Sequence, residues 1–214
     1  MSKLAIFDCD STLSSIEGID ELARLKGREI LDQVADLTNQ AMDGKVPLDQ
    51  VFGKRIDIIR PNRDDCEIVA NLYMQTIDED AASLISDLKS EGWTPVILSG
   101  GFRELILPLA EKLGITSVEA VPLHLDEDGN YGDFDRSYPT TRNGGKPEII
   151  ANLRQKHSPQ RLIMIGDGIS DLECQDHVDA FIGFGKYANR QLVRQGAQHF
   201  VTELKQVFRI AQAI

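Results

Sequence analysis

Two aspartates follow the first apolar run of the chain at a spacing of two residues. Asp8 and Asp10 stand in DCDST, directly after LAIF. Side chains two positions apart lie on the same side of an extended backbone, so the two carboxylates can share one site. Carboxylate oxygens so placed suit a hard metal ion such as Mg²⁺. The alternative is an acidic turn in which Ser11 or Thr12 caps a helix.

A second pair of aspartates ends the motif GDGISD. Asp167 and Asp171 follow the apolar run RLIMI, which is typical of a buried strand. Open α/β sheets bind ligands beyond the carboxyl ends of their strands, where both acidic motifs would meet. We therefore predict an Mg²⁺ site made by Asp8, Asp167 and the main-chain carbonyl of Asp10, with Asp171 just behind it. An ordinary strand-to-helix turn is the alternative.

Two further motifs could bind a phosphate group. Ser99, Gly100 and Gly101 end another apolar run, and they offer a hydroxyl and unobstructed backbone N–H groups before a helix whose N-terminus favours an anion. Lys146 follows two glycines at the start of a later helix, where the helix dipole alone would not favour a cation. This lysine can neutralise charge on a phosphoryl group and on the carboxylates. A plain glycine-rich turn and a solvated lysine are the alternatives.

The elements that must position these residues read as strands alternating with helices. Four short apolar runs predict buried parallel strands, and helical patterns lie between them. The runs span 4–12, 94–102, 161–171 and 179–185. This alternation predicts a doubly wound α/β sheet, Rossmann-like in architecture.

The interval between the first two runs is far longer than one crossover helix requires. Residues from about 14 to 76 read as several helices with glycine and proline at their boundaries. We predict a helical-bundle cap over 15–76, inserted into an α/β core of residues 1–14 and 77–214. A DG signal between alternating flanks predicts a small β-hairpin within 120–138.

Composition limits the partners of the protein. The chain has 214 residues and a formal net charge of −11, whereas binding to nucleic acid or to an anionic membrane depends on clustered Lys and Arg. We therefore expect neither partner. The first apolar run is too short for a signal peptide, which favours a cytoplasmic protein. Three scattered cysteines, Cys9, Cys66 and Cys174, indicate neither a disulfide framework nor a zinc site.

The order of the four motifs resembles that of the haloacid dehalogenase superfamily. DCDST matches its first motif, Ser99 the second, Lys146 the third and GDGISD the fourth. The resemblance covers the whole chain, and in detail the sequence is similar to the phosphoserine phosphatase family. The segments that carry this similarity are DCDSTL, EGIDELA, AMDGKVP, GKRIDII, SGGF and DAFIGFG.

This resemblance implies a Mg²⁺-dependent phosphatase that uses an aspartyl-phosphate intermediate. It makes Asp8 the nucleophile and Asp10 the acid that protonates the leaving alkoxide and then the base that activates water. Ser99 and Lys146 would stabilise the transferred phosphoryl group. The implied reaction is hydrolysis of O-phospho-L-serine, the last step of serine biosynthesis.

The resemblance also implies a substrate pocket. Glu17 matches the residue that binds the substrate ammonium group, and Arg55 the residue that binds its carboxylate. The remaining implied contacts are Ser99, Gly100, Gly101, Ser170, and an apolar lining from Met42 and Gly44. The sequence departs from the family at Ser170, where relatives have Asn or Thr, and at Leu48, where relatives often have Phe.

Other functions remain open from the sequence. The nearest is a phosphatase or phosphotransferase of the same fold that acts on another small phosphomonoester, such as phosphohomoserine. A more remote alternative is a non-catalytic module that binds Mg²⁺ or a phosphorylated ligand. The partner expected in each case is a small phosphorylated metabolite, and the chain is expected to be a monomer or a homodimer.

Overall fold

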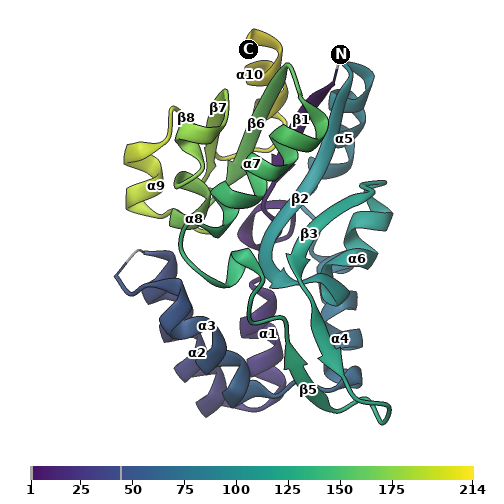
Figure 1. Ribbon diagram of the computed structural model, residues 1–214, viewed down its shortest axis with the longest axis vertical. Coiled ribbons are helices and arrows are strands. Elements are labelled where there is room, and N and C mark those ends of the chain that lie inside the picture. The colour runs from purple at the N-terminus through teal and green to yellow at the C-terminus, as the bar shows by residue number, and fades with distance from the viewer. Residues whose placement is uncertain (1, 44) are drawn as a thin grey trace.

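Six parallel strands form the centre of the computed structural model, which describes residues 2–43 and 45–214. The sheet has the order β3-β2-β1-β6-β7-β8, and every neighbouring pair runs parallel. The strands are β1 (Lys3–Phe7), β2 (Trp93–Phe102), β3 (Ser117–Val121), β6 (Arg161–Gly166), β7 (Ala180–Phe184) and β8 (His199–Val201). The predicted doubly wound sheet is confirmed (Figure 1).

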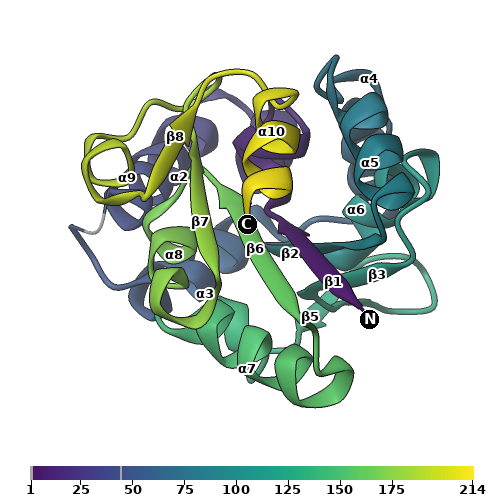
Figure 2. The ribbon, with the colours of Figure 1, turned by 90° about the horizontal axis from the view of Figure 1, so that it is seen from above.

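Helices cover both faces of the sheet, as β1 illustrates. Ala5 and Phe7 belong to the core on one face, whereas Leu4 and Ile6 belong to a separate core on the other. The first face is covered by α5 (Ala81–Ser90), α6 (Arg103–Lys112) and α10 (Gln206–Ala213). The second is covered by α7 (Gly145–His157), α8 (Ile169–Leu172) and α9 (Gln191–Gly196) (Figure 2). Burial on both faces explains why the strands read as continuous apolar runs.

The predicted strand set was incomplete. It contained β1, β2, β6 and β7, but neither β3 nor β8. β3 ends at Val121, immediately before Pro122, so part of it falls inside the segment predicted as a hairpin. β8 is only three residues long, which is too short for a periodic signal.

The predicted hairpin is confirmed over a narrower range than 120–138. β4 (Leu123–Leu125) pairs antiparallel with β5 (Tyr131–Phe134). Gly129 takes a positive φ of 84° in the turn, which glycine adopts without strain. The carbonyl oxygen of Gly129 accepts a hydrogen bond of 2.8 Å from the backbone N–H of Arg63, which joins the hairpin to the segment after β1.

In the described part of the chain, four α-helices lie between β1 and α5, at the carboxyl end of the sheet (Figure 1). They are α1 (Gly18–Leu25), α2 (Arg28–Met42), α3 (Leu48–Ile59) and α4 (Arg63–Gln75). Asn62 caps α4 through a reciprocal pair of bonds with Asp65, at 2.9 and 2.8 Å. α4 also packs against α6 of the core. The insertion is therefore helical, while the cap boundaries at 15 and 76 stay a prediction.

No helix within residues 2–43 and 45–214 is both long and apolar enough to cross a membrane.

Candidate active site

Asp8 lies at the point where the sheet changes direction. β1 lies between β2 and β6 in the sheet. After β1 the chain continues to β2 on one side, and after β6 it continues to β7 on the other side. Asp8 follows β1 directly, and its N–H donates to the carbonyl oxygen of Ile165 at 2.9 Å. Crevices at such switch points are the usual ligand sites of open α/β sheets.

Three carboxylates gather here. One oxygen from each of Asp8, Asp167 and Asp171 lies within 4.8 Å of the others, and all three residues are buried. Burial, followed by the charge of Asp171, raises the pKa of Asp8 from 3.8 to about 7. Burial and the charges of Glu17 and Asp8 raise the pKa of Asp167 well above its usual value. This concentration of negative charge and oxygen donors fits a divalent cation.

Lys146 supplies part of the compensating charge. Its Nζ lies 2.8 Å from Oδ1 of Asp8 and 2.5 Å from Oδ1 of Asp171. Burial lowers the pKa of Lys146, but the charges of Asp171 and Asp8 outweigh this effect and raise it above its usual value. A side chain at Gly145 would place its Cβ 1.7 Å from the carbonyl oxygen of Pro139, so glycine allows α7 to begin this close to the site.

Asp171 lies in this cluster, but its oxygens are already engaged. Oδ1 accepts from Lys146, and Oδ2 accepts from the backbone N–H of Gly168 at 2.9 Å. These bonds favour a supporting place for Asp171 behind the expected metal ligands Asp8 and Asp167.

The segment predicted to bind phosphate, residues 99–101, differs from its sequence prediction in one respect. Ser99, Gly100 and Gly101 do not follow β2 but lie within it, and the pairing with β3 shifts register between Leu98 and Phe102. Ser99 is 1% exposed. Its hydroxyl oxygen accepts a hydrogen bond of 2.9 Å from the backbone N–H of Gly101. The strand thus carries a hydroxyl and glycine backbone up to the start of α6.

Asp10 lies in a tight turn over Cys9–Leu13, in which Ser11 has a φ of 49°. Its Oδ2 accepts from the backbone N–H of Gly18 at 3.2 Å, and its Oδ1 accepts from the hydroxyl of Tyr73. Burial, then the charges of Glu17 and Asp8, raise the pKa of Asp10 well above its usual value. The protonated form of this carboxyl is therefore favoured more than in water.

Tyr73 links α4 to Asp10 without lining the pocket, and sequence reasoning missed it. It is fully buried, and its Oη occupies the space next to Gly18, where a Cβ would come within 2.0 Å. We expect Tyr73→Phe to lower kcat about tenfold, since one hydrogen bond that orients Asp10 is lost, with little change in KM. Steady-state kinetics would measure this. An equal rise in KM, or a melting temperature that falls in step with kcat, would contradict an orienting role.

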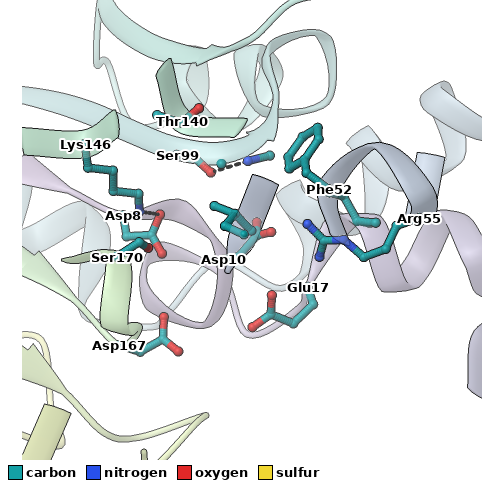
Figure 3. A pocket seen from close by; sticks show the side chains of 14 residues that line it. Asp8, Asp10, Glu17, Phe52, Arg55, Ser99, Thr140, Lys146, Asp167 and Ser170 are labelled. Carbon is teal, nitrogen blue, oxygen red and sulfur yellow. Dashed lines mark hydrogen bonds and ion pairs between the residues drawn. The ribbon is translucent and has the colours of Figure 1, made fainter. Parts of the chain in front are cut away.

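Glu17 and Arg55 lie at the other end of the same pocket. Glu17 precedes α1 and its Oε1 accepts from the Ser11 hydroxyl at 2.7 Å. Arg55 is 3% exposed on α3, and its Cζ lies 5.3 Å from the centre of the Phe52 ring. Figure 3 shows Asp8, Asp167 and Ser170 on one side, Glu17 and Arg55 on the other, and Asp10 between them.

The structure brings together most of the residues singled out from the sequence. The pocket is lined by the predicted residues Asp8, Asp10, Glu17, Arg55, Ser99, Gly100, Gly101, Lys146, Asp167 and Ser170. Gly44 and the side chain of Met42 lie outside the part of the chain that the structure describes. Ile19, Leu48, Phe52 and Thr140 complete the lining.

Comparison with known proteins identifies the family. A family model described as haloacid dehalogenase-like hydrolase matches residues 2–174. Phosphoserine phosphatase of Drosophila melanogaster is 39% identical over 209 residues, covering 96% of this chain and 77% of that protein. The Bos taurus phosphoserine phosphatase is 37% identical over 199 residues, covering 92% and 88%. The chain belongs to the phosphoserine phosphatase family of haloacid dehalogenase-like hydrolases.

A solved structure of this family agrees with the fold. It is described as a phospho-aspartyl intermediate analogue of phosphoserine phosphatase, has a TM-score of 0.85 at 25% identity, and the match covers 98% of both chains. Phosphatases of the haloacid dehalogenase type generally use Mg²⁺, and the acidic cluster of this chain could hold such an ion.

Arg190 is a charged neighbour of the site that the sequence analysis did not name. Its Nε lies 3.1 Å from Asp167, and its two terminal nitrogens lie 3.5 Å from Glu17 and 3.7 Å from Asp43. The signal that could have found it is position, because it stands in the loop after β7, at the carboxyl end of a predicted strand. Phe52 could have been found as the residue one helical turn before Arg55.

Proposed function

We propose that this protein hydrolyses O-phospho-L-serine to serine and phosphate, the last step of serine biosynthesis, through an aspartyl-phosphate on Asp8. One observation carries the proposal. A single pocket joins a buried acidic cluster with Lys146 at one end to two opposite charges at the other, the half-buried Glu17 and the buried Arg55. Phosphoserine has a phosphate at one end and an ammonium and a carboxylate at the other, so both ends are matched.

The phosphate end would hold Mg²⁺ through Asp8, Asp167 and the carbonyl oxygen of Asp10. When bound, the ion supplies positive charge that offsets the carboxylates and the phosphoryl oxygens. Lys146 adds a second positive charge beside Asp8, and Ser99 adds a hydroxyl donor. Phosphoryl transfer depends mainly on such positioning and charge neutralisation.

The chemical steps use the two aspartates in turn. An oxygen of Asp8 bonds to phosphorus as the ester P–O bond breaks, and Asp10 gives its proton to the departing serine oxygen. Asp10, now ionised, takes a proton from the water that attacks phosphorus, which releases phosphate and restores Asp8. The raised pKa of Asp10 supports its role as the acid of the first step.

The amino-acid end would select the substrate. Glu17 would accept from the ammonium group, and Arg55 would bind the carboxylate as a planar donor pair. Arg190 lies close enough to the Glu17 carboxylate to occupy it before the substrate ammonium arrives. Leu48 and Phe52 supply apolar lining, and Phe52 lies against Arg55.

Residues 15–76 would act as a cap over this pocket. Glu17 and Arg55 lie in this segment, whereas Asp8 and Asp167 lie in the core. Closure of the segment would exclude water from the attack of Asp8 on phosphorus, and reopening would release serine. Deletion of residues 16–75 tests this role. A folded deletion variant that keeps selectivity for phosphoserine would contradict it.

A substrate panel tests the proposed function. Phosphate release from L-phosphoserine with Mg²⁺ is compared with release from phosphohomoserine, phosphothreonine and p-nitrophenyl phosphate, and alcohols are added as phosphoryl acceptors. Selective turnover of L-phosphoserine supports the proposal. Preference for another ester, or transfer to an alcohol in place of water, favours the phosphatase or transferase alternatives. Binding without turnover of any ester favours the non-catalytic module.

We expect the affinity for Mg²⁺ to fall as the pH is lowered through about 7. In the metal-free protein Asp8 has a pKa raised to about 7, and the pKa of Asp167 is raised as well. A protonated carboxyl cannot bind the ion, so below this range binding must release protons. Calorimetric titration with MgCl₂ should show about a tenfold or larger loss per pH unit below pH 7. The same affinity at about pH 6 and pH 8 would contradict this.

A further inference from the structure

Arg55 has a support behind it that does not touch the pocket. Its Nη1 donates to Oγ1 of Thr38 at 3.0 Å, and that hydroxyl donates to Oδ1 of Asp20 at 2.7 Å. The three residues come from α3, α2 and α1, and neither Thr38 nor Asp20 lines the pocket. Arg55 and Thr38 are 3% and 2% exposed.

The direction of hydrogen bonding in this chain is set by chemistry. A guanidinium has only donors, so Thr38 must accept from Arg55. The single hydrogen of the hydroxyl is then left for Asp20, or for the carbonyl oxygen of Val34 at 3.0 Å. The carboxylate is both closer and charged, so it is the stronger acceptor. Thr38 thereby connects the positive charge of Arg55 to the negative charge of Asp20.

This contact restricts the orientation of the Arg55 guanidinium. Nη1 donates to Thr38, and the guanidinium lies over the ring of Phe52. The Nε atom is buried and has no hydrogen-bond partner among residues 2–43 and 45–214. Because Nε is buried, a ligand in the pocket meets the terminal nitrogens of the guanidinium, which point toward Asp10 and Glu17 (Figure 3). Arginine binds carboxylates best through two parallel N–H groups, so the orientation of the guanidinium decides how well such a pair meets a ligand.

We propose that Thr38 and Asp20 are positioning residues that select for the substrate carboxylate by holding the guanidinium of Arg55 in one orientation at the pocket. The inference rests on the proposed function and adds to it that selectivity depends on two residues that never contact substrate. Without the Thr38 hydroxyl, the guanidinium can turn directly toward Asp20 or Glu17, whose charges both act on it. A ligand carboxylate would then meet a misdirected donor pair.

The test compares two substrates on Thr38→Val, which keeps the size and branching of the side chain. For L-phosphoserine we expect KM to rise about tenfold with kcat little changed, as for the loss of one oriented charge-assisted contact. For p-nitrophenyl phosphate, which has no carboxylate, kcat/KM should be unchanged. Thr38→Ser retains the hydroxyl and should restore the wild-type KM.

Asp20→Asn provides a second variant should Thr38→Val fold poorly. It should raise KM for L-phosphoserine in the same selective way, because the acceptor loses its charge. Asp36→Asn is the matched control, since Asp36 is an exposed aspartate on α2 that accepts only from Gln40 among the described residues. Melting temperatures of all variants report on folding separately from selectivity.

The possible outcomes separate this inference from the function on which it rests. If Arg55→Ala impairs L-phosphoserine turnover but Thr38→Val and Asp20→Asn do not, the positioning role is wrong and the proposed function stands. If Thr38→Val weakens both substrates equally, the role of Thr38 is structural and the inference is wrong. If Arg55→Ala itself leaves L-phosphoserine turnover intact, the carboxylate contact and the inference both fail.

Discussion

Asp8→Asn should abolish hydrolysis of every phosphate ester while leaving the protein folded. Removal of a nucleophile costs about 10⁴-fold or more in kcat, because the remaining groups can bind but cannot form the covalent intermediate. The amide keeps the size of the carboxyl, and the sheet around it does not depend on the charge. Phosphate release from L-phosphoserine and from p-nitrophenyl phosphate would both be measured. Wild-type protein quenched during turnover should carry a phosphoryl group that the variant lacks.

The same variant should be more stable than the wild type when metal is absent. The pKa of Asp8 is raised from 3.8 to about 7, so its folded form holds a proton more tightly than its unfolded form. Wild-type stability therefore rises as the pH falls from about 7 toward 4, and above pH 7 the ionised group costs on the order of 4 kcal/mol. Asp8→Asn removes this cost, offset in part by the lost contact with Lys146.

Asp176→Asn is a suitable control, since Asp176 is exposed and outside the pocket. It should change neither activity nor the melting temperature. Metal-dependent turnover that survives Asp8→Asn would mean that another group attacks phosphorus. Lower metal-free stability of the variant at about pH 8 would mean that the bond between Asp8 and Lys146 outweighs the cost of burial.

Arg55→Ala should change which esters the protein accepts. We expect kcat/KM for L-phosphoserine to fall about 10²- to 10³-fold, since truncation of one partner of a buried charge pair commonly costs 2 to 5 kcal/mol. Turnover of p-nitrophenyl phosphate should stay within about twofold, because that ester offers no carboxylate. The ratio of the two kcat/KM values is the measurement, and it is independent of the active enzyme concentration.

Two further variants make this comparison specific. Lys54→Ala removes a neighbouring but exposed cation of α3, and such charges contribute little. Arg55→Lys keeps the charge without the planar fork, so it should recover only part of the selectivity. Equal losses on both esters in Arg55→Ala would indicate a damaged cap and would remove the support for an amino-acid substrate.

The sheet could be predicted largely because it is buried on both faces. Continuous apolar runs that end in DCDST, SGGF and GDGISD indicate β1, β2 and β6 together with the edge at which they meet. β3 was missed because its alternation merges with that of the hairpin beyond Pro122. β8 was missed because its three residues are too few to show an alternating apolar pattern.

From the residues alone, the site was most predictable where its residues follow strands, whereas Arg55 on a distant helix was indicated only by the family resemblance. Asp8, Ser99 and Asp167 stand next to apolar runs, so their positions follow from the topology of the sheet. Tyr73 meets Asp10 only because α4 packs back against the core, and no local pattern indicates this contact. The same holds for Thr140, a buried hydroxyl in a short turn that lines the pocket.

The two bonds that hold Asp10 have a consequence for how sequences of this type can diverge. Both donors, the N–H of Gly18 and the hydroxyl of Tyr73, belong to the segment that interrupts the core. If this segment were exchanged between two relatives, Asp10 of one protein would receive both hydrogen bonds from residues of the other. A chimaera that takes only one of positions 18 and 73 from the donor should lose turnover, because a Cβ at position 18 would clash with the Tyr73 hydroxyl, so these positions should vary together rather than one at a time.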